Sequence, residues 1–214
     1  MKNIVEIYKD YRTMPNLVMH QMRVAAVAMQ IIKSLDMEVD KESVVKACLL
    51  HDMGNIIKFQ LDFFPEWNKP DILAYWQGVK EEYILKYGSN EHKASLLIAD
   101  ELGASVKTKD LVYSVDSASV EMIANEDDFD RKLCLYADGR VSPSGVVSIN
   151  ERSLEAKKRY ENHRNKFDEE RRIFHNTNLN LIEKQIFSHT SIRPEDINDE
   201  SIKDYLEKLK SYFI

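Results

Sequence analysis

The stretch Ala47-Cys-Leu-Leu-His-Asp-Met-Gly54 decides how this sequence is interpreted. An apolar run typical of a buried helix ends directly in a His-Asp pair, and a glycine follows shortly afterwards. Burial of His51 and Asp52 without partners would carry a large free-energy cost, because both side chains are polar. Coordination of a metal ion is one efficient way to satisfy them, since imidazoles and carboxylates are ligands that suit divalent ions.

The pair is expected at the end of a helix. Asp40 can cap the free amides at the start of that helix, and Gly54 is expected to stop it. Neighbouring helical residues point about 100° apart. His51 and Asp52 can therefore share one ion only if the ion lies over the seam between them, so other helices must supply the remaining ligands.

One such helix is expected upstream of the pair. Pro15 suits a first helical turn, and His20 lies early on the helix that follows. Its inner face is expected to carry apolar residues three and four positions apart, namely Leu17, Val24, Val27, Ala28, Ile31 and Ile32. Residues 55–70, just after the pair, are aromatic and irregular, and we interpret them as a covering loop.

Two further helices are expected downstream. Ser89 can cap a helix that carries His92 and ends at Gly103, and Asp128 can cap a helix that reaches Asp138 near its end. Both helices place a candidate ligand or catalytic group on a regular element.

The whole chain is predicted to be all-α, because its 6 glycines and 5 prolines are few and apolar residues recur at helical spacing. Residues 1–147 are expected to form the core, and residues 148–214 a charged helical extension packed on or beside it. Ser148-Ile-Asn-Glu151 has the form of a capping box before a helix to about residue 175. A last helix is expected to be capped by Ser201. The extension can face solvent or a partner in a homodimer, although no heptad repeat is sustained.

Composition excludes some classes of function. A chain of 214 residues with 43% apolar residues can bury a core of its own. The net charge of −6 argues against binding duplex nucleic acid or an anionic membrane, and no segment has the apolar length of a membrane span. Cys48 and Cys134 lie in apolar helical patterns, which predicts buried reduced thiols and a cytoplasmic location.

The ordered set of an early His, a His-Asp doublet and a later Asp resembles the HD superfamily of metal-dependent phosphohydrolases. The similarity extends from about Pro15 to Val147, and it includes Glu91-His-Lys-Ala-Ser95 and Tyr136-Ala-Asp138. It implies a compact helical bundle with the site between helices. It also implies a divalent ion (Mn, Co, Mg, Fe, Ni or Zn) that activates water and offsets phosphoryl charge. The implied metal ligands are His20, His51, Asp52 and Asp138, and Asp52 can also steer the water.

The resemblance makes His92 the next candidate. Members with additional histidines between the doublet and the last Asp bind two metals, whereas this chain offers only His92 there, so one ion is favoured. His92 either donates a hydrogen bond or proton to the phosphate or leaving group, or is an ordinary helix-surface histidine.

Four more residues are candidates for substrate binding. Arg23, Lys93 and Arg140 can complement phosphate charge, although each also has an interpretation as a surface charge. Asn55 stands where members with a His-Asp-x-x-Glu pattern have an acid, so a water-orienting carboxylate is missing there.

The predicted function is hydrolysis of a nucleotide or another small phosphoester, with monoester and diester cleavage both open. A di-iron oxygenase is the first alternative, and the scarcity of middle histidines argues against it. A metal-binding sensor without turnover is the second, and the missing acid at Asn55 keeps it open. His163, His175 and His189 lie beyond the region of similarity and are assigned no site role.

Overall fold

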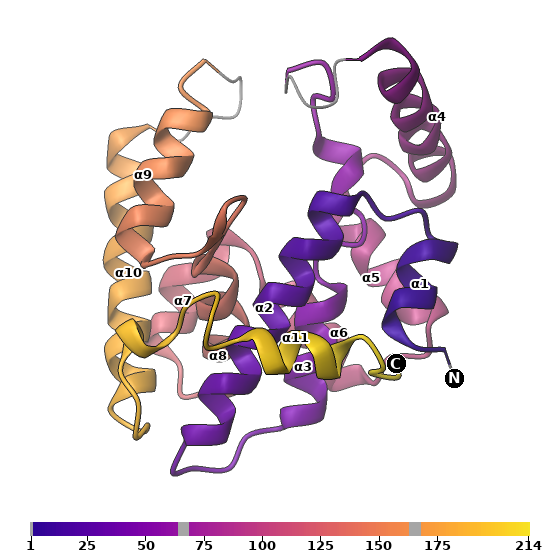
Figure 1. Ribbon diagram of the computed structural model, residues 1–214. Coiled ribbons are helices and arrows are strands. Elements are labelled where there is room, and N and C mark those ends of the chain that lie inside the picture. Colours follow the sequence, from indigo (N-terminus) through magenta and orange to yellow (C-terminus); the bar gives the residue numbers. More distant parts are fainter. Residues whose placement is uncertain (1, 64–68, 163–167) are drawn as a thin grey trace.

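A computed structural model describes residues 2–63, 69–162 and 168–214 of the chain (Figure 1). Within these residues the fold is helical, with one small two-stranded antiparallel sheet, so the prediction of an all-α fold is confirmed. In chain order, the elements up to residue 139 are α1 (Ile4–Asp10), α2 (Pro15–Ser34), α3 (Lys41–Leu50), η1 (Asn55–Lys58), α4 (Pro70–Tyr87), α5 (Glu91–Glu101), α6 (Val106–Ser114), η3 (Ser117–Ser119), α7 (Val120–Asn125) and α8 (Phe129–Gly139). Then follow β1 (Val141–Ser142), β2 (Gly145–Val146), α9 (Ile149–Arg159), α10 (Glu169–Phe187), η4 (Pro194–Asp196) and α11 (Lys203–Leu209).

Helices α2, α3 and α8 pack against one another in the middle of the molecule (Figure 1). Helix α2 begins at Pro15 as predicted, and its apolar residues at helical spacing are buried because they face α3 and α8. The buried face of α3 is similarly apolar up to Leu50, after which the His-Asp pair begins. The apolar stripes of these helices therefore determine where the polar residues at their ends come together.

Three of the predicted helix caps, at Asp40, Asp128 and Ser148, are confirmed, and two others are wrong. The side chains of Asp40 and Asp128 accept backbone hydrogen bonds at the starts of α3 and α8, as expected. Helix α5 is capped by Asn90, one residue later than Ser89, because the Asn90 side chain accepts the hydrogen bond from the third helical amide. Ser201 does not cap α11, since its hydroxyl instead donates to Gln30 of α2 and to a neighbouring backbone carbonyl.

Gly54 has a different role from the predicted one. Helix α3 has already ended at Leu50, and Gly54 has a φ of −89°, which any residue can adopt. A Cβ at this position would lie 2.4 Å from the carbonyl oxygen of Glu91 and 2.8 Å from the amide nitrogen of Ser95. Glycine is therefore needed because the turn after the His-Asp pair packs directly on the backbone of α5.

The C-terminal segment does not begin with one helix reaching residue 175. The capping box at Ser148 is present, but α9 ends at Arg159 and a separate helix, α10, begins after the cap residue Asp168. Helix α10 packs on α7 and α8, and α11 packs on α2. The segment adds Leu179, Ile182, Ile186, Ile197, Ile202 and Leu209 to the same apolar core as the preceding helices.

The two ends of the chain lie side by side (Figure 1). The amide of Ile4 donates to the carbonyl oxygen of Tyr212 at 2.8 Å, and Asn3 pairs with Phe213 in a single β-bridge. The C-terminal segment thus closes on the start of the chain through backbone hydrogen bonds as well as through apolar packing.

The remaining expectations concern loops and cysteines. The segment predicted as a covering loop includes η1 and a turn that reaches Phe63, while Phe64 and Trp67 fall outside the described residues. Cys48 and Cys134 are both free and buried. None of the helices in the described parts of the chain has the length and apolar character needed to cross a membrane.

Candidate metal centre

Three polar side chains meet where α2 passes the end of α3. His20 lies in the second turn of α2, His51 is the residue that ends α3, and Asp52 follows it. One ligand atom from each of the three residues lies within 4.8 Å of the others. Among the described residues this is the one group of three or more histidine, cysteine or acidic side chains with such an arrangement.

The buried imidazole of His51 is oriented by the helix that carries it. Its Nδ1 donates to the carbonyl oxygen of Cys48 at 2.9 Å, which points Nε2 toward the cluster. Among the described residues, Nε2 is buried without a hydrogen-bond partner, because the carboxylate oxygens of Asp52 and Asp138 that face it are both 3.6 Å away. Buried polar atoms are nearly always hydrogen-bonded. The geometry is that of a histidine ligand whose second nitrogen is held by a backbone carbonyl.

Asp138 lies at the edge of this cluster. Its Oδ1 accepts a hydrogen bond from His20 Nε2 at 2.9 Å, although the two residues are 118 positions apart in the sequence. The carboxylate is outside the group of three, and 35% of the Asp138 side chain is exposed. The structure thus brings the four predicted ligands together, with three in a tight group and Asp138 facing both imidazoles.

The charges of the cluster are strongly coupled. Burial lowers the pKa of His51, but the negative charges of Asp52 and Asp138 outweigh burial and raise it to about 9. Burial also opposes ionisation of Asp138, yet the adjacent imidazoles of His20 and His51 hold its pKa well below the ordinary value. A divalent cation would take the place of the proton that the carboxylates favour on His51, so binding of the ion releases that proton.

Two buried polar residues that the sequence analysis did not single out hold the His-Asp turn in place. The amide of Asp52 donates to Oε1 of Gln21 at 3.2 Å, and the amide of Gly54 donates to Oγ of Ser95 at 2.9 Å. Gln21 and Ser95 are both fully buried. Each is a polar residue inside an otherwise apolar helical stripe, and that signal could have identified them.

Comparison with known families agrees with this geometry. Residues 17–113 match the family model of the HD domain. The chain contains an HD domain. The match includes His20, His51, Asp52 and His92, and it ends before α8, so Asp138 lies outside the matched range. HD domains belong to a superfamily of metal-dependent hydrolases and bind divalent metals. No curated protein and no solved structure matches the chain significantly.

His92 lies near the candidate metal cluster without joining it. It is on the first turn of α5, whose backbone contacts Gly54, and 31% of its side chain is exposed. Its Nε2 lies 3.8 Å from a carboxylate oxygen of Glu91 and 3.7 Å from one of Asp116. The role of His92 in contacting substrate remains a prediction, and so does that of its exposed neighbour Lys93.

Asn55 is buried beside the His-Asp turn. It is the first residue of η1, and its amide donates to the carbonyl oxygen of Asp52 at 3.1 Å. Its position relative to Asp52 is therefore fixed by the backbone, while its predicted contact with substrate remains a prediction.

The prediction that Arg140 contacts phosphate is wrong for this structure. Arg140 is only 3% exposed, and its guanidinium donates to the carbonyl oxygens of Val147, Pro194 and Ile197 and to the hydroxyl of Tyr136. These bonds use the guanidinium to join α8, the segment before α9 and η4. Proximity to Asp138 in sequence does not place Arg140 in the site, because its side chain is used in packing the C-terminal segment.

Arg23 lies one helical turn after His20 and is partly buried. Its Nε is 3.4 Å from Oδ1 of Asp199 and makes no hydrogen bond to the residues that the structure describes. The carboxylate of Asp199 also accepts a hydrogen bond from the amide of Val146 at 3.3 Å. Arg23 is therefore near the cluster but faces a carboxylate, and its predicted contact with phosphate remains a prediction.

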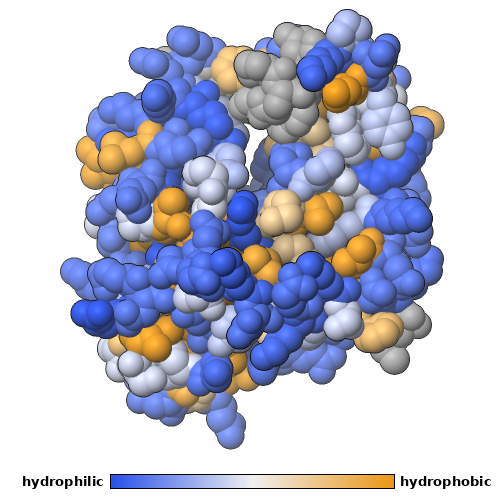
Figure 2. All heavy atoms as spheres, viewed as in Figure 1, coloured by the Kyte–Doolittle hydropathy of each residue, from blue (hydrophilic) through white to orange (hydrophobic). Residues whose placement is uncertain are grey.

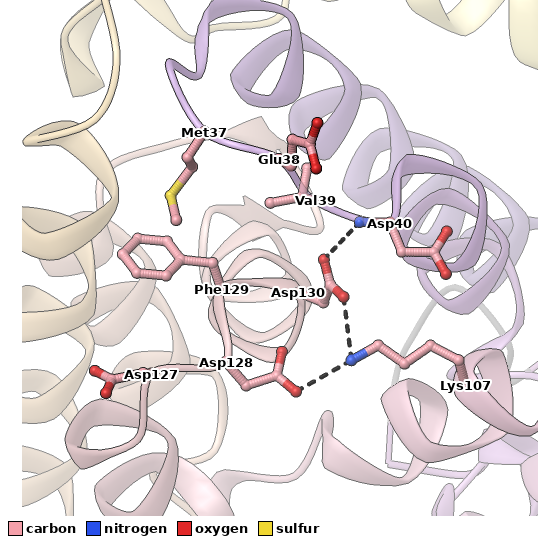
Figure 3. Close-up of a pocket in the computed structure, with 9 residues that line it drawn as sticks. All are labelled: Met37, Glu38, Val39, Asp40, Lys107, Asp127, Asp128, Phe129 and Asp130. Carbon is pink, nitrogen blue, oxygen red and sulfur yellow. Dashed lines mark hydrogen bonds and ion pairs between the residues drawn. The ribbon is translucent and has the colours of Figure 1, made fainter.

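An open pocket of about 520 Å³ lies away from the HD-domain cluster (Figure 3). Four of its lining residues are aspartates, and Lys107 is its one basic lining residue. Lys107 Nζ lies 3.1 Å from carboxylate oxygens of both Asp128 and Asp130. Asp130 and Asp138 are at opposite ends of α8, about 12 Å apart at roughly 1.5 Å per residue. This pocket repels an anionic substrate, so we do not assign the substrate to it.

Proposed function

We propose that this protein is a metal-dependent phosphohydrolase that acts on a nucleotide or another small phosphoester. The observation that carries the proposal is the buried Nε2 of His51, which lies in the segment that matches the HD domain, has no hydrogen-bond partner among the described residues and faces the carboxylates of Asp52 and Asp138. A cation is the ligand that satisfies this nitrogen and the carboxylates together.

His20, His51 and Asp52 would hold the ion, with Asp138 as the fourth ligand at the edge of the group. A divalent ion bound there lowers the pKa of a water molecule and offsets negative charge on a phosphoryl oxygen. Two imidazoles and two carboxylates suit borderline transition ions such as manganese, iron, cobalt, nickel or zinc. The set is compatible with magnesium chiefly through its carboxylates.

The protein side chains orient the reacting groups. The Asp52 side chain is 19% exposed, so one carboxylate can both bind the ion and accept a hydrogen bond from water. Gln21 fixes the backbone at Asp52, and Cys48 fixes the ring of His51, so neither ligand needs to reorganise. His92, on the neighbouring turn, is proposed to donate a proton or hydrogen bond to the leaving group.

A small substrate fits the charge of the protein better than a polymer does. The net charge of −6 gives no broad basic surface for the many phosphates of a duplex. A single phosphoryl group needs only one bound cation and a few local donors. We therefore place nucleotides and other small phosphoesters first among substrates.

Elemental analysis combined with phosphate-release assays tests the proposal. The purified protein is expected to contain about one divalent transition ion per chain, because His92 lies outside the group of ligands. A panel of mononucleotides and small phosphoesters is expected to show phosphate release that chelators abolish and added ions restore. Two irons per chain with oxygen consumption and no phosphate release would contradict it.

A matched pair of histidine variants separates the site from general effects. His51→Gln removes a buried candidate ligand, whereas His189→Gln changes a histidine that is 42% exposed and pairs with Asp36. We expect loss of metal and of phosphate release in the first variant only. Equal activity in both variants would contradict the assignment of His51.

A further inference from the structure

One face of α10 follows α8 toward the metal cluster. At one end Tyr136 donates to a carboxylate oxygen of Glu183 at 2.7 Å. One turn earlier on α10, Leu179 packs against Gly139, where a Cβ would lie 3.1 Å from a Leu179 methyl group. Residues four apart share a helix face. His175, one turn before Leu179, therefore lies beside the end of α8 that carries Asp138.

The electrostatic surroundings of His175 agree with this placement. Burial lowers the pKa of the half-buried His175, the charge of Asp138 raises it, and the charges of Arg171 and Arg152 lower it. Coulomb effects weaken with distance and with exposure to water. Two arginines and a carboxylate of the candidate metal centre thus act on the same imidazole.

Arg171 and Arg152 come from two helices that are joined to each other. Arg171 is four residues before His175 on α10, so the two share a face. Helix α9, which carries Arg152, is linked to α10 by a hydrogen bond from Arg172 to the hydroxyl of Ser153 at 3.2 Å. Figure 1 shows α9 and α10 side by side along one side of the molecule.

The surface is hollowed beside these helices. Figure 2 shows a recess between the side of the molecule formed by α9 and the side that carries the start of α2, with largely hydrophilic residues around it. Arg171 is exposed, and Arg152 is partly buried with its Nη1 2.9 Å from a carboxylate oxygen of Glu155. Arg171 lines an open pocket with Asp168, Glu170 and Phe174, and both guanidinium groups are less buried than that of Arg140, which donates to backbone carbonyls.

We propose that Arg152, Arg171 and His175 form an anion-binding wall beside the metal centre, and that this wall receives the phosphate group of the substrate. The inference rests on the proposed function and assigns part of it to a segment beyond the family match, which ends at residue 113. A guanidinium complements phosphate through paired N–H donors, and a nearby imidazole adds one more donor.

Titration of inorganic phosphate into the manganese-loaded full chain tests the wall without relying on turnover. Arg171→Gln and Arg152→Gln are each expected to weaken phosphate binding by roughly tenfold or more, since each removes charge-assisted hydrogen bonds to the anion. His175→Gln is expected to have a smaller effect in the same direction. The control is Arg193→Gln, because Arg193 is 77% exposed and pairs with its close neighbour Asp196.

Metal content and thermal unfolding are measured for every variant, so that a folding defect is recognised. Wild-type phosphate affinity in both arginine variants, with metal and fold intact, would overturn the wall. Failure of phosphate to bind the metal-loaded wild type at millimolar concentration would overturn it as well. Phosphate binding that depends on both arginines, in a protein that hydrolyses no phosphoester, would support the wall and reject only the hydrolase function.

Discussion

The two ends of α3 and α8 carry acidic groups in very different surroundings. At the end near His51, Asp52 and Asp138 face two imidazoles, and Nε2 of His51 has no hydrogen-bond partner in the described parts of the chain. At the other end, Asp40 and Asp128 cap the two helices. There Asp130 accepts from the amide of Asp40 at 2.9 Å and lies 3.1 Å from Lys107 (Figure 3).

The difference shows why an acidic cluster alone does not identify a metal site. Asp40, Asp128 and Asp130 already accept hydrogen bonds from backbone amides, and the last two also pair with the ammonium group of Lys107, so an added cation would gain little there. The cluster near His51 has converging ligand atoms and a buried nitrogen that makes no hydrogen bond to the described residues. A bound cation would therefore remove the free-energy cost of burying that nitrogen without a partner. We therefore expect substitutions at the His51 end to reduce metal content and turnover, and substitutions at the Lys107 end to leave both near wild type.

The largest contrast is expected between Asp52→Asn and Asp130→Asn. Asp52→Asn should reduce metal content sharply and lower metal-dependent turnover by roughly a hundredfold or more, because a ligand and a water-orienting group are lost together. Asp130→Asn should keep both near wild type. Elemental analysis and steady-state kinetics measure the contrast, and full metal occupancy in Asp52→Asn would remove Asp52 from the ligand set.

Removal of the metal ion is expected to lower the free energy of unfolding only in proteins whose cluster at His51 is intact. A ligand that binds only the folded state, at 100 times its dissociation constant, adds about 2.7 kcal/mol to the free energy of unfolding. Chelation should therefore lower the melting temperature of the wild type and of Lys107→Met, and leave that of His51→Gln unchanged. A chelator-sensitive melting temperature in His51→Gln would show that the ion binds elsewhere.

Gly54→Ala is expected to lower the free energy of unfolding by roughly 1–3 kcal/mol, since the new Cβ would overlap the backbone of α5. The matched control is Gly78→Ala, in the middle of α4, where a Cβ meets nothing within 4 Å. That change should stabilise the protein by roughly 0.5–1 kcal/mol, because alanine is the better helix former. Urea unfolding measures both, and equal effects would contradict the close approach at Gly54.

The smallest expected effect concerns Asp128→Ala, which removes the cap of α8 and one partner of Lys107. Loss of a helix cap costs about 1 kcal/mol. The free energy of unfolding should fall by that amount while metal content and turnover remain unchanged. If Asp128→Ala instead loses metal, the two ends of α8 are coupled and the contrast between them is wrong.

Local signals in the sequence predicted the elements around the site well. Pro15 at the start of α2, Asp40 and Asp128 as caps, and the apolar run before His51 all act through neighbouring residues, and each has the predicted role. At Gly54 and Ser201 the local rules were wrong because a contact with a distant segment decides what each residue does. A glycine looks the same in the sequence whether it ends a helix or allows another backbone segment to pack closely against it.

The sequence by itself determined the helical class of the fold and the residue types that can bind a metal, because both depend on local pattern and on the chemistry of single side chains. Only the tertiary structure decided that His20 and Asp138 meet across 118 residues and that Arg140 is committed to the carbonyls of the C-terminal segment. Only the tertiary structure also placed His175, to which sequence reasoning assigned no role, beside the end of α8. These outcomes depend on which helix faces pack together, and the free energy of that packing is shared among residues far apart in the chain.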